Sequence, residues 1–325
     1  MPTWLHVLSA LTTLTLCSAA LVDSAVLISG GPMESFPSLT ELDLSSNELS
    51  SFPEALSAMG GVLLVLDLSS NQLCERVVLG PTVIDALSNL EHLDLGSNRI
   101  AYFPQLGALT ALKRLDLSTN ALVALPHSIG ALAHLEDLDL SGNRLDDLPP
   151  LDGLTALKKL DLGQNTFHAL PASIGVLSNL ERLDLCDNPD LRDLPTTMSC
   201  LTALTVLDVS STGFGDRPDG AFPGVIFELA ALTALDASEC GVRTVLGIGR
   251  LAALRSLDLA NCRVCEFDDA TRALAQLCDL DISDNPGVLE GASDEAIAWL
   301  VRHAEQGCEI DIGGGSHPLF ATFTY

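Results

Sequence analysis

Basic and aromatic side chains are scarce in this chain of 325 residues. The chain has 16 lysines and arginines against 43 aspartates and glutamates, which gives a formal net charge of −27. A surface this acidic repels nucleic acid phosphates and anionic membranes, so neither is expected as a partner and a basic protein is favoured. The alternative interpretation is that the charge only keeps a large protein in solution. Aromatic residues make up 4% of the chain and all hydrophobic residues 47%, so aliphatic side chains must build the core.

Catalytic and cofactor-binding motifs are also missing. The chain contains no G-x-x-x-x-G-K-[S/T] phosphate loop, no H-E-x-x-H zinc motif and no kinase catalytic loop. Its 7 histidines are dispersed, and no nucleophile, base and orienting residue stand in a recognisable pattern. The sequence therefore predicts a protein without enzymatic activity and without a cofactor.

Cysteine usage argues against a secreted, disulfide-bonded protein. The 9 cysteines are odd in number and scattered, and no asparagine lies in an N-x-[S/T] glycosylation sequence. Cys262 and Cys265 have C-x-x-C spacing, but no second such pair and no histidine pair completes a tetrahedral metal site. These features predict a reducing, cytoplasmic compartment and no bound metal.

What the chain does have is a repeat. A set of aspartates occurs in one local frame, nearly always between two aliphatic residues, at steps of 22 to 30 residues. They are Asp43, Asp67, Asp94, Asp116, Asp139, Asp161, Asp184, Asp208, Asp236, Asp258, Asp281 and Asp311. A period of roughly 20–30 residues is typical of stacked supersecondary units that each contact only their neighbours. The unbroken period predicts one elongated solenoid instead of two globular domains.

The clearest copy of the repeat runs from 135 to 145 and reads L-x-x-L-x-L-x-x-N-x-L. Alternation at Leu138, Asp139 and Leu140 predicts a short strand with its leucines inward and its aspartate outward. One repeat cannot bury its own leucines, so neighbouring repeats must stack and pair their strands in parallel. The asparagine is expected to point inward and to satisfy backbone groups of the turn.

The asparagine position changes along the chain. It is occupied by Asn47, Asn71, Asn98, Asn120, Asn143, Asn165, Asn188, Thr212, Cys240, Cys262 and Asn285. Threonine and cysteine offer a single, weaker donor, so residues 212–262 are expected to be the less rigid stretch.

This pattern is the leucine-rich repeat signature, and the second half of the repeat narrows the resemblance. A proline follows the N-x-L segment at Pro53, Pro104, Pro126, Pro149, Pro171 and Pro195. Segments such as Ile129-Gly130-Ala131-Leu132 then complete an L-P-x-x-I-G-x-L pattern. Over residues 36–290 the chain therefore resembles the intracellular, Ras-group-related leucine-rich repeat proteins of plants and animals. The L-x-G-x-I-P segment that is usual in plant receptor ectodomains is missing.

The resemblance implies an α/β repeat fold, a curved horseshoe-shaped solenoid with a parallel β-sheet on its concave face. It further implies a non-catalytic, cytoplasmic scaffold for signal transduction that binds a partner protein on that face. We expect such a scaffold to be a monomer. The alternative is a ligand-binding ectodomain, or a fragment of a larger receptor, at a secreted or cell-surface location.

The N-terminal residues 1–35 are interpreted as a degenerate first repeat or cap. Thr15 stands 28 residues before Asp43, which is within the range of the other steps. The alternative is a signal peptide, but the apolar stretch from Leu5 to Leu16 lacks a positively charged n-region.

The C-terminus is expected to cap the array. Residues 291–312 predict a helix followed by a last strand, and residues 313–325 predict a flexible tail. The apolar stripe of this helix should be Ile297, Leu300, Val301 and Ala304. Long steps mark insertions at 74–88 and 213–228, and the second is expected to project a turn-rich loop at 217–220.

The expected binding surface is the outward side of the strands. Alternating charge can fix the register of a partner, and it is richest in the central repeats. The candidate residues are Arg114, Asp116, Asp137, Asp139, Lys159, Asp161, Arg182 and Asp184. Like-charge neighbours should raise the pKa of several aspartates in the row, and least beside Arg114, Lys159 and Arg182.

Two other interpretations of the aspartate row stay open. The carboxylate can simply suit this frame, because it accepts hydrogen bonds from the serine that follows. A calcium ladder is the third interpretation, but calcium takes roughly six to eight oxygen ligands and one row of aspartates offers fewer at each point.

Overall fold

The computed structural model describes residues 10–22, 36–74, 83, 86–103, 105–265, 271, 273–286, 288 and 294–313. The chain forms two compact units, residues 1–180 and residues 181–325. Pro104, most of the insertion at 74–88 and the predicted tail after Gly313 lie outside the described residues. Among those described, no helix is long and apolar enough to cross a membrane.

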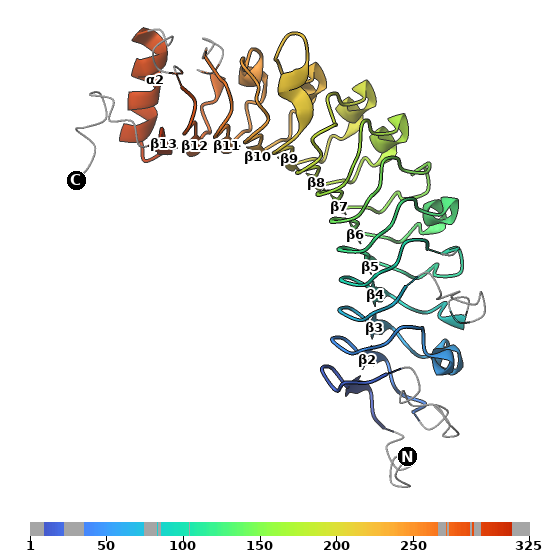
Figure 1. Cartoon of the computed structure of the whole chain (residues 1–325). Helices are drawn as coiled ribbons and strands as arrows, with labels where there is room; N and C mark the ends of the chain where they lie inside the picture. Colours follow the sequence, from blue (N-terminus) through green and yellow to red (C-terminus); the bar gives the residue numbers. More distant parts are fainter. Residues whose placement is uncertain are drawn as a thin grey trace. The chain divides into compact units, whose positions relative to one another are not determined.

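Each unit is a stack of three-residue strands that pair in parallel and in chain order (Figure 1). In the first unit the strands are β1 (Thr13–Thr15), β2 (Glu41–Asp43), β3 (Val65–Asp67), β4 (His92–Asp94), β5 (Arg114–Asp116), β6 (Asp137–Asp139) and β7 (Lys159–Asp161). In the second unit they are β8 (Arg182–Asp184), β9 (Val206–Asp208), β10 (Ala234–Asp236), β11 (Ser256–Asp258), β12 (Asp279–Asp281) and β13 (Glu309–Asp311). The predicted solenoid of stacked parallel strands is confirmed.

The register between strands follows the repeat. Leu115 lies opposite Leu138, and Asp116 lies opposite Asp139 on the same pair of strands. The middle leucine of β6 is buried while its two neighbours are partly exposed, as the period of two requires. A slip by one residue would move every leucine to solvent, so leucine burial fixes the alignment of the aspartates.

Short 3₁₀ helices lie on the side of each unit away from the strands (Figure 1). They are η3 (Glu54–Met59), η4 (His127–Ala131) and η5 (Ala172–Val176) in the first unit, and η6 (Thr196–Cys200), η7 (Gly213–Asp216), η8 (Gly224–Glu228) and η9 (Ile248–Arg250) in the second. A proline precedes η3, η4, η5, η6 and η8 with φ between −69° and −53°. Proline favours these starts because its φ is already fixed and the first N–H of a helix has no partner to lose.

The core of each unit is made of leucine rows between the strands and these helices. In the repeat of β6, Leu135, Leu138, Leu140 and Leu145 are all 0–1% exposed. Fully burying one such side chain stabilises the fold by about 1.5–3 kcal/mol relative to leaving it in water. Each leucine packs against the same position of the next repeat, so this stabilisation exists only in the stack.

The asparagine position forms a second row inside the stack. The Nδ2 group of Asn143 donates to the carbonyl oxygens of Leu117 (2.9 Å), Leu140 (2.9 Å) and Ser141 (3.2 Å). Its Oδ1 accepts the backbone N–H of Leu122 at 3.0 Å. Leu117 and Leu122 belong to the preceding repeat, so one amide satisfies buried backbone groups of two repeats. The predicted inward asparagines are confirmed.

Threonine and cysteine at this position make fewer bonds. The hydroxyl of Thr212 donates to the Val209 carbonyl at 2.7 Å, and the Cys240 thiol donates to the same oxygen at 2.9 Å. The Cys262 thiol donates to the carbonyl of Ala237 at 3.2 Å. Cys262 is 4% exposed and has the expected inward position.

The residue before the inward side chain has a left-handed backbone in each described repeat. Only Gly142 is a glycine at this place, and examples of the others are Ser46, Thr119 and Gln164, with φ of 51–55°. A non-glycine residue in this conformation costs roughly 1–2 kcal/mol. The turn is retained because it points the next side chain into the core.

The insertion at 213–228 is anchored by aromatic side chains that the expectation of a turn-rich loop did not include. Phe214 is fully buried, Phe222 is 3% exposed, and the Phe222 ring contacts both Phe214 and Phe227 edge-to-face. The aromatic cluster packs the segment against its own unit, while Asp216, Pro218 and Asp219 in the turn between Phe214 and Phe222 stay exposed. The turn residues alone predict a loop, and the three phenylalanines around them determine how it is attached.

The capping helix is α2 (Asp294–Glu305), and β13 pairs in parallel with β12. Its most buried side chains are Ala296, Trp299 and Leu300, at 2–3% exposure. The expected stripe is wrong in register, since Ile297, Val301 and Ala304 are only partly buried. The indole of Trp299 has the largest apolar area on the helix. Its burial therefore determines that the face of α2 that carries Trp299 is the one turned toward the core.

The asparagine row yields the first prediction. Replacing Asn143 by Ala should lower the free energy of unfolding by about 1–3 kcal/mol for each buried backbone group left unpaired. Leu138→Ala, which leaves a cavity, should cost about 2–5 kcal/mol. Urea denaturation of the whole chain measures both changes.

The matched control is Asn179→Ala. Asn179 is exposed and makes one bond, to the Thr155 carbonyl at 2.8 Å. Its loss should change stability by less than about 0.5 kcal/mol. Equal effects of Asn143→Ala and Asn179→Ala would mean that the inward amide does not hold the stack.

Candidate functional site

The outward side chains of the strands in the first unit form the candidate binding surface, which we call the sheet surface. Arg114, Asp137 and Lys159 are direct neighbours on β5, β6 and β7. Lys159 Nζ lies 3.5 Å from a carboxylate oxygen of Asp137. The next position on the same strands holds Asp116, Asp139 and Asp161. Six of the eight predicted site residues are thus adjacent in one unit.

The other two predicted residues lie in the second unit. Arg182 and Asp184 are on β8, where they face Val206 and Asp208 of β9. Their closest described neighbours on this side are therefore an apolar residue and another acid.

A second row of charge on the sheet surface was missed at the sequence level. The residue before each strand reads Glu91, Lys113, Glu136 and Lys158. Lys113 pairs with Glu91 at 2.7 Å, and Lys158 pairs with Glu136 at 2.7 Å. The hydrogen bond from the lysine lowers the pKa of Glu91 and likewise of Glu136. The 22–23-residue spacing of Glu and Lys in the sequence was the available clue.

At the start of these strands the two rows together place charges of one sign side by side, ahead of the aspartate at the end of each strand. Strand β5 presents Lys113 and Arg114, while β6 presents Glu136 and Asp137. Exposed ion pairs of this kind contribute little to stability, about 0–1 kcal/mol. Because these side chains are exposed, each can leave its ion pair and bind a charged group of another protein. They are therefore better suited to binding a partner than to stabilising the fold.

A hollow of about 360 Å³ lies on this surface over β3 to β6. Its lining includes Asp67, His92, Asp94, Arg114 and Asp137. Of the predicted residues, Asp116 and Asp139 also line it, whereas Lys159 and Asp161 do not. The hollow therefore lies one to two repeats closer to the N-terminus than the predicted patch.

Asp94 is the most perturbed carboxylate in the hollow. Burial raises the pKa of Asp94 to about 6, against the pull of its hydrogen bond from the Gly96 N–H at 2.9 Å, and nearby Asp116 and Asp67 raise it further. At Asp139 burial also raises the pKa, but both the N–H and the hydroxyl of Ser141 donate to that carboxylate. Gly96 has no hydroxyl to offer, which leaves Asp94 less stabilised in its charged form.

The expected cause of these shifts needs correction. Burial, not like-charge repulsion, is the largest cause at Asp94, Asp139, Asp208 and Asp258. Asp139 is shifted even though it lies between the strands of Arg114 and Lys159, where the smallest effect was expected. These four carboxylates are half-buried, so the loss of hydration raises their pKa more than their mutual repulsion does.

The aspartate frame has a local structural reason. The Asp43 carboxylate accepts bonds from the Ser45 N–H (2.9 Å) and hydroxyl (2.7 Å). The same pair of bonds occurs at Asp116, Asp139, Asp208 and Asp236. The interpretation that aspartate suits this frame by binding the following serine is confirmed at these five positions, whereas at Asp94 and Asp258 the residue two places on is Gly96 or Ala260, which donates its N–H.

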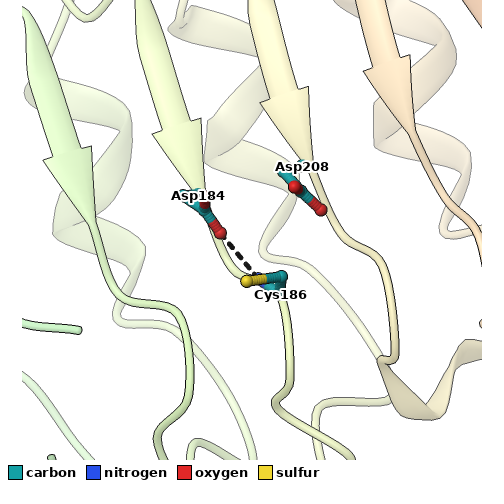
Figure 2. A group of neighbouring side chains, drawn as sticks. All are labelled: Asp184, Cys186 and Asp208. Carbon is teal, nitrogen blue, oxygen red and sulfur yellow. Dashed lines mark hydrogen bonds between the residues drawn. The ribbon is translucent and has the colours of Figure 1, made fainter. Parts of the chain in front are cut away.

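One group in the second unit has the donor types of a metal site. Asp184, Cys186 and Asp208 offer ligand atoms that all lie within 4.8 Å of one another (Figure 2). Burial raises the pKa of the Cys186 thiol far above its usual range, and Asp184 raises it further. A thiol must lose its proton to bind a metal, and three donors fall short of the roughly six to eight that calcium takes. This group does not support the calcium interpretation.

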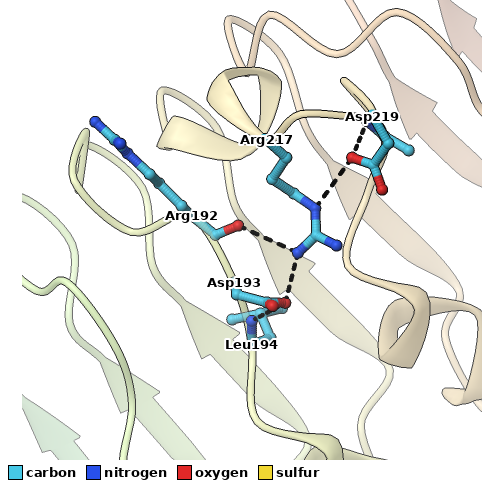
Figure 3. A network of polar contacts seen from close by, with 6 residues as sticks. Arg192, Asp193, Leu194, Arg217 and Asp219 are labelled. Carbon is cyan, nitrogen blue, oxygen red and sulfur yellow. Dashed lines mark hydrogen bonds and ion pairs between the residues drawn. The ribbon is translucent and has the colours of Figure 1, made fainter.

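The insertion of the second unit is anchored by a polar network (Figure 3). Arg217 pairs with Asp193 at 2.8 Å and with Asp219 at 3.4 Å, and it donates to the Arg192 carbonyl at 3.5 Å. Asp193 also accepts the N–H of Leu194 at 2.9 Å. Arg217 is thereby used for structure, which makes the expected 217–220 loop a weak candidate for binding.

Comparison with known families agrees with this architecture. The family described as Leucine Rich repeats (2 copies) matches residues 88–128 and 133–172, and the family described as Leucine Rich Repeat matches residues 38–59. The chain is therefore a leucine-rich repeat protein. Proteins of this class are generally binding scaffolds and typically have no catalytic activity.

Curated relatives are similar over short stretches. The chain is 35% identical over 89 residues to a protein phosphatase 1 regulatory inhibitor subunit homologue of Arabidopsis thaliana, covering 27% of each protein. It is 36% identical over 119 residues to trophoblast glycoprotein of Macaca fascicularis, covering 31% of this chain and 28% of the relative. The chain thus spans less than a third of these relatives.

Solved structures match over nearly the whole chain. An internalin of Listeria monocytogenes aligns with a TM-score of 0.65 at 19% identity, covering 96% of this chain and 89% of the internalin. A leucine-rich repeat protein of Leptospira interrogans aligns with a TM-score of 0.60 at 24% identity, covering 96% and 92%. Identities this low establish the fold and nothing further.

The perturbed Asp94 yields the second prediction. A carboxyl whose folded pKa is raised contributes stability below its unfolded pKa, near 3.8, and loses that stability as pH rises through about 6. Asp94→Asn should therefore be neutral at pH 4 and should stabilise the chain at pH 7. The expected gain is about 1 kcal/mol, because solvent screens a half-exposed group.

Thermal melts between pH 4 and 7 and an NMR titration of the Asp94 carboxyl measure this. Asp219→Asn is the control of opposite sign, because the Ala221 N–H and Arg217 lower the pKa of Asp219. That variant should lose stability at neutral pH relative to acid pH. A pH-independent effect of Asp94→Asn, with an ordinary Asp94 titration, would contradict the assignment.

Proposed function

We propose that this chain is a non-catalytic scaffold that binds a partner protein on the sheet surface of its first unit, as a cytoplasmic regulator of signalling. The observation that carries the proposal is the hollow over β3 to β6, bordered by strands of alternating charge. A surface that combines a recess with fixed charges selects both the shape and the register of a partner.

The partner that fits best is basic. The hollow is lined by more carboxylates than cations, and the chain as a whole carries a net charge of −27. A lysine or arginine of the partner that enters the hollow would face Asp67, Asp94 and Asp116. Long-range attraction would speed its approach, and salt would slow it.

The cysteines support the cytoplasmic part of the proposal. All nine lie among the described residues and are free thiols, including exposed Cys17, Cys200, Cys265 and Cys278. Extracellular domains usually oxidise such thiols or lack them. Signalling is supported by the resemblance to Ras-group-related proteins and by the local similarity to a phosphatase regulatory subunit.

A receptor ectodomain is the second candidate. Its support is the 35% identity over 104 residues to a calmodulin-binding receptor kinase of Arabidopsis thaliana, which covers 16% of that kinase. Capture of a small extracellular ligand by the sheet surface, with no cytosolic protein retained, would favour this candidate.

The third prediction tests the sheet surface by charge reversal. Glu136→Lys together with Asp137→Lys reverses the charge at the start of β6, so that β5, β6 and β7 all present two positive side chains ahead of their outward aspartates. We expect at least a tenfold loss of partner capture from native lysate, read by quantitative mass spectrometry. The association rate of the captured partner with the unmodified chain should fall as salt rises from about 50 to 200 mM.

The matched control is Asp146→Lys with Asp147→Lys. These residues are exposed in the same repeat but lie off the strands, and the change in net charge is identical. The control should keep binding, and both double variants should melt near the unmodified chain. Equal losses in the two variants would show that only net charge matters, and full binding by the β6 variant would exclude the sheet surface.

A further inference from the structure

A second recess lies in the first unit, away from the strands, and we call it the arginine groove. It has a volume of about 550 Å³. Its lining includes Arg99, Ala101, Tyr102, Ala121, Val123 and Arg144. These residues follow the inward asparagines of three successive repeats, so the groove crosses the repeats instead of following one.

The groove results from one small side chain between two long ones. Ala121 occupies the place in its repeat that Arg99 and Arg144 occupy in the neighbouring repeats, directly after the asparagine. Backbone bonds of 2.9 Å, from Ala121 N–H to the Ile100 carbonyl and from Arg144 N–H to the Leu122 carbonyl, hold the three segments together. Ala101 and Ala121 are half-buried in the lining, whereas Arg99 and Arg144 are exposed.

Within the described part of the chain, the two guanidinium groups have no partner. Neither Arg99 nor Arg144 forms an ion pair or a side-chain hydrogen bond with any residue that the structure describes. Other arginines and lysines of this acidic chain do pair, as Lys113, Lys158 and Arg217 show. Arginines without an ion pair to a described residue also occur elsewhere, as at Arg182 and Arg263, so what sets Arg99 and Arg144 apart is that both line the same recess.

Apolar exposure accompanies the free charge. Tyr102 is 64% exposed and Val123 is 38% exposed, and both border the groove. Exposed tyrosine beside arginine is typical of protein-binding surfaces, because the ring adds contact area at a small entropic cost. The recess thus offers a carboxylate-binding pair and an apolar contact at once.

We propose that the arginine groove docks an acidic peptide segment of a partner protein, with one carboxylate on Arg99, one on Arg144 and an apolar residue against Tyr102. A guanidinium binds a carboxylate through two parallel hydrogen bonds, which gives direction as well as affinity. This surface is separate from the sheet surface and selects the opposite charge.

The spacing of the arginines defines a probe. Arg99 and Arg144 are two repeat steps apart, roughly 10 Å where neighbouring backbones are hydrogen-bonded. A polyproline II segment rises roughly 3.1 Å per residue with three residues per turn, so side chains at i and i+3 share a face roughly 9 Å apart. A Glu-Pro-Pro-Glu core matches this distance and places proline rings beside Tyr102.

The experiment titrates the full chain into an acetylated, amidated Glu-Pro-Pro-Glu peptide with an uncharged dye, followed by fluorescence anisotropy. A Lys-Pro-Pro-Lys peptide is the charge-reversed probe. The variants are Arg99→Gln with Arg144→Gln, and Ala121→Leu, which fills the groove but keeps both charges. Arg263→Gln is the matched control, because Arg263 is exposed at the same repeat position in the second unit.

We expect saturable binding of the glutamate peptide to the unmodified chain and to Arg263→Gln. Both groove variants should weaken it at least tenfold, and the lysine peptide should not compete. The sheet-surface variant Glu136→Lys/Asp137→Lys should bind the glutamate peptide normally, which separates this test from that of the proposed function.

Three results would overturn the proposal. The first is that the glutamate peptide does not bind the unmodified chain, and the second is that it binds the double arginine variant equally well. The third is that the double arginine variant loses peptide binding while Ala121→Leu binds the peptide normally. The last result would mean that the arginines act as isolated surface charges without a groove. Thermal melts show whether each variant folds. If Ala121→Leu does not fold, the result for Arg99→Gln with Arg144→Gln decides whether the proposal stands.

Discussion

The structure depends on the fact that no single repeat can bury its own leucines or satisfy its own turn. The leucines need the next repeat to exclude water, and the asparagine amide bonds carbonyl groups of two repeats at once. Because buried backbone groups must be paired, these bonds fix where each repeat sits on its neighbour. The fold therefore exists only when repeats stack. Because the leucines and asparagines hold the stack together, a strand of three residues is long enough to pair with its neighbours.

This constraint leaves the outward side chains free. On β5, β6 and β7 the middle leucine is set by the core, whereas Arg114, Asp137 and Lys159 are not. Charge can then vary from strand to strand without changing the backbone. Aspartate at the last strand position is a partial exception, since it accepts bonds from the next turn. Because these bonds give the aspartates a structural role, their presence in each repeat does not indicate that they bind a partner.

The first unit presents two recesses of opposite character. One lies on the strands, where five aspartates line it, and the other lies after the asparagines, where it is lined by two arginines that pair with no described residue. Rigid stacking holds both in place, because each is built on backbone that neighbouring repeats bond on either side. In the second unit Arg217 is used internally, where it pairs with Asp193 and Asp219.

The sequence by itself determined the repeat, the strand positions, the inward leucines and asparagines and the scarcity of catalytic groups. It could do so because these properties depend on period and on side-chain type, which are local. Only the tertiary structure decided that Asp94 is the perturbed carboxylate, that the hollow lies over β3 to β6, and that the phenylalanines anchor the 213–228 insertion. Likewise Arg99 and Arg144 are 45 positions apart, and Ala121 creates a groove only because stacking places it between them. The burial of a side chain and the shape of a recess depend on the size of the side chains in the neighbouring repeats. A local sequence pattern contains no information about those side chains.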